Sequence, residues 1–154
     1  FASWRIGWMV FPAVLEPALR KIQDTLIICP PVIAQYAAAG ALSLGPGFVT
    51  EKVAALAKTR IMVQRELAAL EAEALAEVPP AEGAFYYLLR IKSDLAPLPY
   101  VTRLIREHKV AVIPGDAFGL ENGCSLRVAY GALQPETVTE GMGRLVEGIK
   151  ALRG

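Results

Sequence analysis

The second half of the chain alternates between strand-like and helix-like segments, and this alternation limits the folds that it can adopt. Residues 84–91 form an aromatic and aliphatic run typical of a strand, and residues 96–108 follow as an amphipathic helix introduced by prolines. Further strands are predicted at 110–113 and 125–130, and a last helix at 134–152. Helices between short strands favour an α/β domain whose helices pack on a small mixed sheet.

The first half of the chain predicts a different set of elements. Alternating side chains predict a strand over residues 4–11, which Pro12 ends, and a helix over residues 15–24. A helix of small residues is predicted over residues 32–42, and the longest helix of the chain over residues 50–76. The strand has no neighbouring strand in its own half, so it needs a sheet elsewhere to join.

Chain length and hydrophobicity limit the number of domains and indicate an excess of apolar surface. A chain of 154 residues has the size of one domain, or of one domain with part of another. Hydrophobic residues, counted without glycine, make up 54% of it, which is above the usual ~45–50% for apolar residues even when glycine is included. We therefore expect apolar surface that faces a neighbour, from the same chain or from another.

Charge and cysteine content exclude several classes of protein. Lysine and arginine number 16, aspartate and glutamate 15, and no run of like charge occurs, so we expect neither a nucleic-acid groove nor binding to an anionic membrane. The longest apolar runs, 8–15 and 26–34, are too short to span a bilayer, and each contains proline. Cys29 and Cys124 lie far apart, so neither a disulfide framework nor a zinc site is expected, and the cytoplasm is the expected location.

The residue types that usually carry catalysis are scarce. His108 is the one histidine of the sequence and lies at a predicted helix end, where it suits the helix dipole. Asp116 and Glu121 share a Gly-rich loop, which is typical of a solvated acidic pair. A metal site and a Ser-His-Asp triad therefore lack their usual participants.

Two arginines are better candidates for a functional site. Arg5 and Arg127 each lie alone in an apolar strand-like segment. An arginine buried in such a segment needs an anionic partner, because a buried unpaired charge is costly. The guanidinium group binds a carboxylate or a phosphate through paired hydrogen bonds. The two residues together predict a site for a small anionic ligand.

Five segments resemble, in order and spacing, the C-terminal part of the class I/II aminotransferases, which are fold-type I pyridoxal-phosphate enzymes. They are 2–10 (ASWRIGWMV), 35–37 (QYA), 83–86 (GAFY), 110–119 (VAVIPGDAFG) and 126–130 (LRVAY). The resemblance covers the whole chain and implies a fold similar to that of the pyridoxal-phosphate-dependent transferases. It implies that residues 1–45, a strand and helices, are the tail of the large cofactor-binding domain. Residues 46–78 are then a long connecting helix, and residues 79–154 the C-terminal small domain.

The resemblance also implies residue roles and an activity. Arg5 is expected to bind the phosphate of pyridoxal phosphate, and Arg127 the α-carboxylate of the amino-acid substrate, with Gly115 and Phe118 lining the entrance. No catalytic residue is expected in this chain, because the lysine that carries the cofactor is expected upstream of Phe1. The parent protein is expected to be a homodimer that transfers an amino group between an amino acid and a 2-oxo acid. This chain alone is expected to be inactive.

Two other interpretations fit the same residues. The chain is a non-catalytic oligomerisation or binding domain if the excess of apolar residues serves an interface. Alternatively, the parent is a fold-type I enzyme with another reaction, such as a lyase or a C–C bond-forming enzyme, because those enzymes resemble the aminotransferases in the same two arginines.

Overall fold

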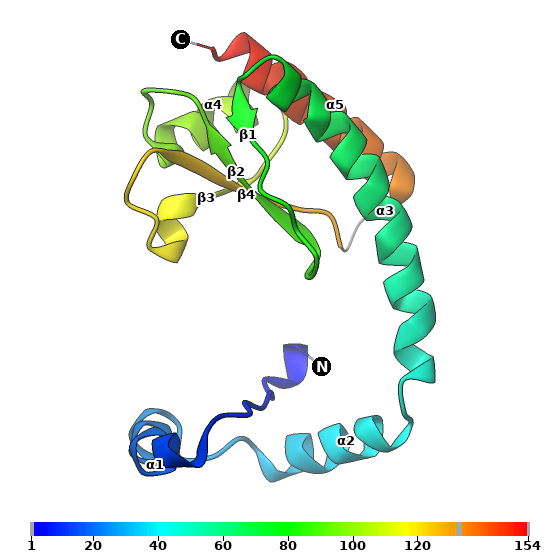
Figure 1. Ribbon diagram of the computed structural model, residues 1–154, viewed down its shortest axis with the longest axis vertical. Coiled ribbons are helices and arrows are strands. Elements are labelled where there is room, and N and C mark those ends of the chain that lie inside the picture. Colours follow the sequence, from blue (N-terminus) through cyan, green and yellow to red (C-terminus); the bar gives the residue numbers. More distant parts are fainter. Residues whose placement is uncertain (1, 132–133, 154) are drawn as a thin grey trace. The chain divides into compact units, whose positions relative to one another are not determined.

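The computed structural model describes residues 2–131 and 134–153. The chain divides into two compact units, unit 1 over Phe1–Glu51 and unit 2 over Lys52–Gly154. Unit 2 contains a small sheet with helices packed against it, and unit 1 contains helices and extended segments (Figure 1). The α/β fold class predicted from the sequence is confirmed. The predicted roles of residues 1–45, 46–78 and 79–154 stay predictions.

The sheet of unit 2 has four strands in the order β1-β2-β4-β3. They are β1 (Ala76–Glu77), β2 (Tyr86–Ile91), β3 (Ile113–Pro114) and β4 (Cys124–Ala129). β4 is paired on both sides, with Leu88 of β2 and Ile113 of β3 each lying opposite Arg127. The strand predicted over residues 110–113 is present as β3, but its pairing is confined to Ile113, the last residue of that range, and to Pro114, which follows it.

The prediction of a mixed sheet is wrong, because every strand pair is antiparallel. Helix α4 (Pro97–His108) connects β2 to β3, and both strands run antiparallel to β4, so β2 and β3 run in the same direction. They are not neighbours, however, since β4 lies between them. A strand-helix-strand pattern in the sequence does not reveal that a later strand is inserted between the two strands that it connects.

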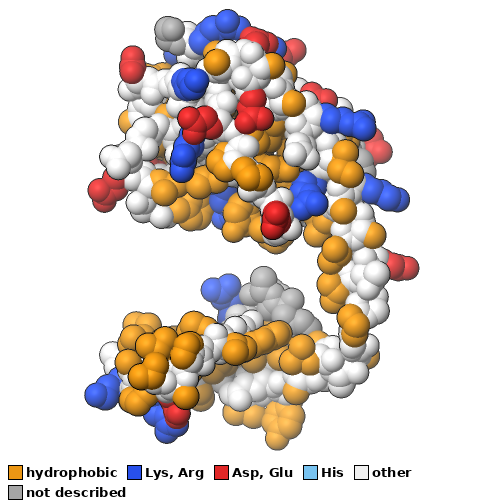
Figure 2. Space-filling model, viewed as in Figure 1, with side chains coloured by type: hydrophobic (Ala, Val, Ile, Leu, Met, Phe, Trp, Pro, Cys, Tyr) orange, Lys and Arg blue, Asp and Glu red, His pale blue; other side chains and the backbone are white. Residues whose placement is uncertain are grey.

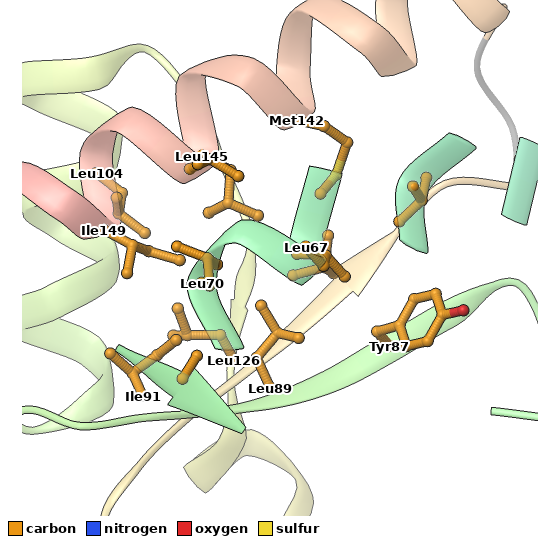
Figure 3. Packing of buried hydrophobic residues seen from close by; sticks show 14 of the residues in the cluster. Leu67, Leu70, Tyr87, Leu89, Ile91, Leu104, Leu126, Met142, Leu145 and Ile149 are labelled. Carbon is orange, nitrogen blue, oxygen red and sulfur yellow. The ribbon is translucent and has the colours of Figure 1, made fainter. Parts of the chain in front are cut away.

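Three helices cover one face of this sheet and share a core with it (Figures 1 and 3). They are α3 (Gly47–Ala72), α4 and α5 (Pro135–Ala151). Fully buried leucines from every layer meet there, with exposed fractions of 0–1%: Leu67, Leu70, Leu89, Leu104, Leu126 and Leu145. Burial of such a side chain contributes about 1.5–3 kcal/mol relative to exposure, so unit 2 has the core of a domain.

Helix α3 ends earlier than the sequence pattern predicted. The predicted helix ran to residue 76, whereas α3 ends at Ala72. Ala74 adopts a left-handed conformation with φ 53°, its N–H donates to the Glu71 carbonyl, and the Leu75 N–H donates to the Leu70 carbonyl. This pair of bonds is the Schellman arrangement that closes a helix. The chain that follows is thereby free to form β1.

Unit 1 departs from the sequence prediction at its beginning. Its elements are η1 (Ala2–Trp4), η2 (Ala13–Leu15), α1 (Glu16–Leu26) and α2 (Val32–Ser43). The two helices were predicted at nearly these positions. The strand predicted over residues 4–11 is wrong, because η1 and a segment without regular structure stand there. No strand is present among residues 2–51, so this segment has no ladder of hydrogen bonds to join.

Apolar side chains of unit 1 are mostly exposed. Ala34 and Ala38 are its buried hydrophobic residues among those described, whereas Trp8 is 71% exposed and Val10 92%. Figure 2 shows hydrophobic side chains over much of the visible surface of this unit. No single described helix is long and apolar enough to cross a membrane. Helices α2 and α3, which are joined at a bend, reach the length and hydrophobic composition of a membrane span only when they are taken together.

Candidate functional site

Arg127 lies in the middle of β4, on the face of the sheet opposite to the helices. Its sequence neighbours Leu126 and Val128 are 0% and 4% exposed, so they point into the core. Because successive side chains of a strand point to opposite faces, Arg127 points away from that core. The side chain is nevertheless half-buried rather than exposed. Something on the outer face must therefore cover it.

Two aromatic rings cover the guanidinium group of Arg127. Its Cζ atom lies 4.2 Å from the centroid of the Tyr86 ring and 5.2 Å from the centroid of the Phe118 ring. Both distances fall within the range of favourable cation–π interactions. These contacts use the faces of the rings, so they leave the hydrogen-bonding capacity of the guanidinium group unused.

The Nε atom of Arg127 is buried and has no hydrogen-bond partner. Within residues 2–131 and 134–153, no carboxylate forms an ion pair with this arginine. Arg90, on the same face of the sheet, is instead exposed and lies 3.5 Å from Glu77. A buried donor without an acceptor costs about 1–3 kcal/mol, and more on a charged group. The structure therefore leaves this charged donor without an acceptor among the described residues.

Local structure holds each ring in place. Phe118 ends the short helix η3 (Gly115–Phe118), and Gly119 follows it with φ 77°. Gly115 fits tightly on β4, since a Cβ atom at this position would lie 2.6 Å from the Cβ atom of Ser125. Tyr86 begins β2, opposite Ala129. The strand pairing and the tight glycine contact thus bring two distant segments to one arginine.

Arg5 belongs to unit 1 and is described there. It follows η1, its side chain is exposed, and its backbone has φ 55°. Arg5 and Arg127 lie in different units, and each is located within its own unit.

The other candidate residues have the surroundings of structural groups. His108 is the last residue of α4. Asp116 lies in η3 and Glu121 in the exposed loop that follows. Cys124 is buried, and burial raises the pKa of its thiol to about 11, which opposes formation of a thiolate. Among the described residues, no group of histidine, cysteine, aspartate and glutamate side chains has the arrangement of a metal site.

Sequence reasoning missed the contact between Tyr86 and Arg127. Phe118 was expected near the site entrance, and it does lie beside Arg127. Tyr86 was part of a motif with no role assigned. The available signal was the strand register: because Tyr86 lies opposite Ala129, it is the diagonal neighbour of Arg127 on the same face.

Comparison with known proteins identifies relatives of this chain. The family model described as Aminotransferase class I and II matches residues 1–145. Aromatic aminotransferase ISS1 of Arabidopsis thaliana is 35% identical over 97% of this chain. An aspartate aminotransferase of Thermotoga maritima is 31% identical over 93% of it. The chain spans 38% and 35% of the lengths of these relatives.

Solved structures show the same similarity. The crystal structure of an aromatic aminotransferase from Pyrococcus horikoshii superposes with a TM-score of 0.74 at 29% identity, covering 97% of this chain and 39% of that chain. An aminotransferase from Mycobacterium tuberculosis gives a TM-score of 0.76 at 25% identity, covering 97% and 38%. The fold of this chain is therefore that of the corresponding part of these proteins.

Proposed function

Because this chain belongs to the class I and II aminotransferase family, we propose that it is part of an enzyme that transfers an amino group between an amino acid and a 2-oxo acid. The chain spans little more than a third of its relatives, so the activity is proposed for the complete protein. We expect the 154-residue chain by itself to be inactive.

The observation that carries this proposal is the state of Arg127. Its guanidinium group is half-buried, its Nε has no acceptor, and no carboxylate of the described chain neutralises it. The α-carboxylate of an amino acid has the charge and the paired oxygens that such a group binds. Arg127 thus supports binding and orientation of the substrate. A fixed orientation keeps the reacting end of the substrate close to the cofactor.

We assign pyridoxal phosphate as the cofactor of the complete enzyme. When bound, it supplies an electron sink for amino-group chemistry, which protein side chains do not provide. Arg5 is the residue of this chain that we assign to its phosphate group, because the guanidinium group pairs with phosphate oxygens and the side chain is exposed. No other described residue is assigned to the cofactor.

We further propose that the complete enzyme is a cytoplasmic homodimer. The exposed apolar side chains of α2 support an interface, with Val32, Ile33 and Tyr36 between 62% and 77% exposed. In a soluble protein, a patch of this kind is usually covered by a neighbour. Sedimentation of the complete protein tests the assembly, and a monomer would contradict it.

An activity test of the complete protein uses donors suggested by the names of the relatives above and of a valine–pyruvate aminotransferase from Mycobacterium tuberculosis, which is 30% identical over 83% of this chain. L-Phenylalanine, L-aspartate and L-valine are each supplied with 2-oxoglutarate or pyruvate, and the amino acid formed is measured. Arg127→Ala should raise the KM of the preferred donor by at least about 30-fold, because loss of a partner in a desolvated ion pair costs several kcal/mol. Arg90→Ala is the matched control, since Arg90 lies on the same face but is exposed.

The same experiment separates the other interpretations. Consumption of the amino acid without a 2-oxo acid would indicate a lyase, and consumption that requires a different carbon substrate to which the amino acid becomes joined would indicate a C–C bond-forming enzyme. Association without any reaction would indicate an assembly domain. An unchanged KM in the Arg127→Ala enzyme would contradict the assigned role of this arginine.

A further inference from the structure

The contacts of Arg127 assign a role to the rings beside it. We propose that Tyr86 and Phe118 are positioning residues, which hold the guanidinium group of Arg127 in the orientation that binds a carboxylate. This inference rests on the function proposed above and extends it to two residues that act through the arginine. We call the three side chains, Tyr86, Phe118 and Arg127, the aromatic clamp.

An arginine side chain has a high conformational entropy, which binding must overcome when the guanidinium group is free to move. In the aromatic clamp, Cζ of Arg127 lies over the Tyr86 ring at 4.2 Å and over the Phe118 ring at 5.2 Å. Ring contacts restrict the guanidinium group before the ligand arrives, so less entropy is lost on binding. They also exclude water from one side of the charge, which strengthens its attraction to an anion.

The rings leave the donors of Arg127 available. A carboxylate side chain in their place would have satisfied Nε and competed with the ligand. An aromatic face attracts the positive charge without accepting its N–H groups in the manner of an oxygen. The unpartnered Nε of Arg127 is the consequence that the structure records.

The supports of the clamp come from two separated segments. Phe85 contacts the Tyr86 ring edge-on at a centroid distance of 5.9 Å, and the Phe85 carbonyl accepts a hydrogen bond from the Tyr130 N–H at 2.9 Å. Phe118 is held by η3, which the Gly115 contact pins to β4. Neither ring is buried, with exposed fractions of 37% for Tyr86 and 48% for Phe118. Substitutions there should change the clamp without unfolding the protein.

The test uses the complete protein loaded with its cofactor and four variants. Tyr86→Leu and Phe118→Leu each remove one ring, Tyr86→Phe keeps the ring and loses the hydroxyl, and Arg127→Lys is the reference. The probes are 3-phenylpropionate, isovalerate and succinate, which lack the amino group of the three candidate donors. Their dissociation constants are measured by titration calorimetry, and KM and kcat are measured with the preferred donor.

We expect each leucine variant to weaken binding of the tightest probe by about three- to tenfold, with a similar rise in KM and an unchanged kcat. Tyr86→Phe should bind as the unchanged protein does, and Arg127→Lys should weaken binding by at least about tenfold. Cofactor absorbance and the urea midpoint should be unaffected. If a leucine variant unfolds, the corresponding methionine variant replaces it, because methionine keeps bulk without a ring.

Two results would overturn the inference, and they differ. If Arg127→Lys weakens probe binding strongly while the leucine variants bind within about twofold of the unchanged protein, the proposed role of the two rings is wrong and the proposed carboxylate site stands. If Arg127→Lys does not change probe binding, or if no probe binds, both the proposed carboxylate site and the proposed role of the rings are wrong.

Discussion

Unit 1 and unit 2 contain comparable helices but differ in what their apolar side chains contact. In unit 2, a continuous core joins three helices to the sheet, and its leucines are almost completely buried. In unit 1, α1 has no buried residue and α2 buries two alanines. Helices are present in both units, whereas a large buried core is present in unit 2 alone among the described residues.

This difference separates the two arginines as well. The surroundings of Arg127 are built by strand pairing and ring contacts inside unit 2. Arg5 follows a short helix in a unit with little buried apolar surface. We therefore expect the surroundings of Arg5 to depend on the rest of the complete protein, and those of Arg127 to be largely independent of it.

The largest expected contrast between the units comes from deletion of a leucine side chain. Leu67→Ala in unit 2 should lower the free energy of unfolding by about 2–5 kcal/mol, because it opens a cavity in a fully buried site. Leu26→Ala in unit 1, where the side chain is 73% exposed, should change it by no more than about 0.5 kcal/mol. Urea denaturation of the 154-residue chain measures both. Equal losses in the free energy of unfolding would show that the core of unit 1 contributes as much stability as that of unit 2.

A smaller difference in stability is expected within unit 2, between substitution of a tightly packed glycine and substitution of a glycine with open space around it. Gly115→Ala should destabilise by about 1–3 kcal/mol, since the new Cβ would lie 2.6 Å from the Ser125 Cβ and 3.0 Å from its carbonyl oxygen. In the Gly143→Ala variant of α5, the added Cβ has no atom within 4 Å, so this change should stabilise the protein by about 0.5–1 kcal/mol. Thermal unfolding of both variants shows whether each substitution raises or lowers the melting temperature. A neutral Gly115→Ala would mean that η3 is not pinned to β4.

A further test concerns the end of α3. Ala74→Gly should stabilise unit 2 by about 1 kcal/mol, because an alanine in the left-handed conformation carries a steric cost that glycine does not. Ala72→Gly, two residues earlier at the last position of the helix, should instead destabilise. Both changes are measured by urea denaturation. Destabilisation by Ala74→Gly would contradict the helix ending described above.

The smallest expected effect is a pH dependence that belongs to unit 2. A hydrogen bond from Lys150, supported by Arg153, lowers the pKa of Glu73 below its usual value, and this carboxylate connects α3 to α5. A lowered carboxyl pKa adds stability at neutral pH, which is lost as the pH falls through the folded-state value. Glu73→Gln should flatten the acid side of the stability profile, measured by urea denaturation at a series of pH values. The contribution is small, because the group is exposed.

Sequence patterns predicted the elements of unit 2 well, since periodicity reports burial and unit 2 supplies that burial internally. Residues 96–108 and 134–152 are helices within one or two residues of the predicted ends. The same reasoning failed for residues 4–11, because alternation indicates a strand only where another strand is available to pair. It also missed Tyr86, since a diagonal contact across β2 and β4 depends on their register, which the separate segments do not contain.

The central proposal is that Arg127 forms an anion site before the ligand binds, and the NMR resonance of its Nε–H group tests this directly. In the complete protein labelled with ¹⁵N-arginine, its resonance is assigned by its loss in Arg127→Lys. Saturation with the donor preferred among L-phenylalanine, L-aspartate and L-valine should shift this resonance downfield and slow its exchange with water, as the buried Nε gains an acceptor. An unchanged resonance in an enzyme that is saturated with its donor would contradict the account.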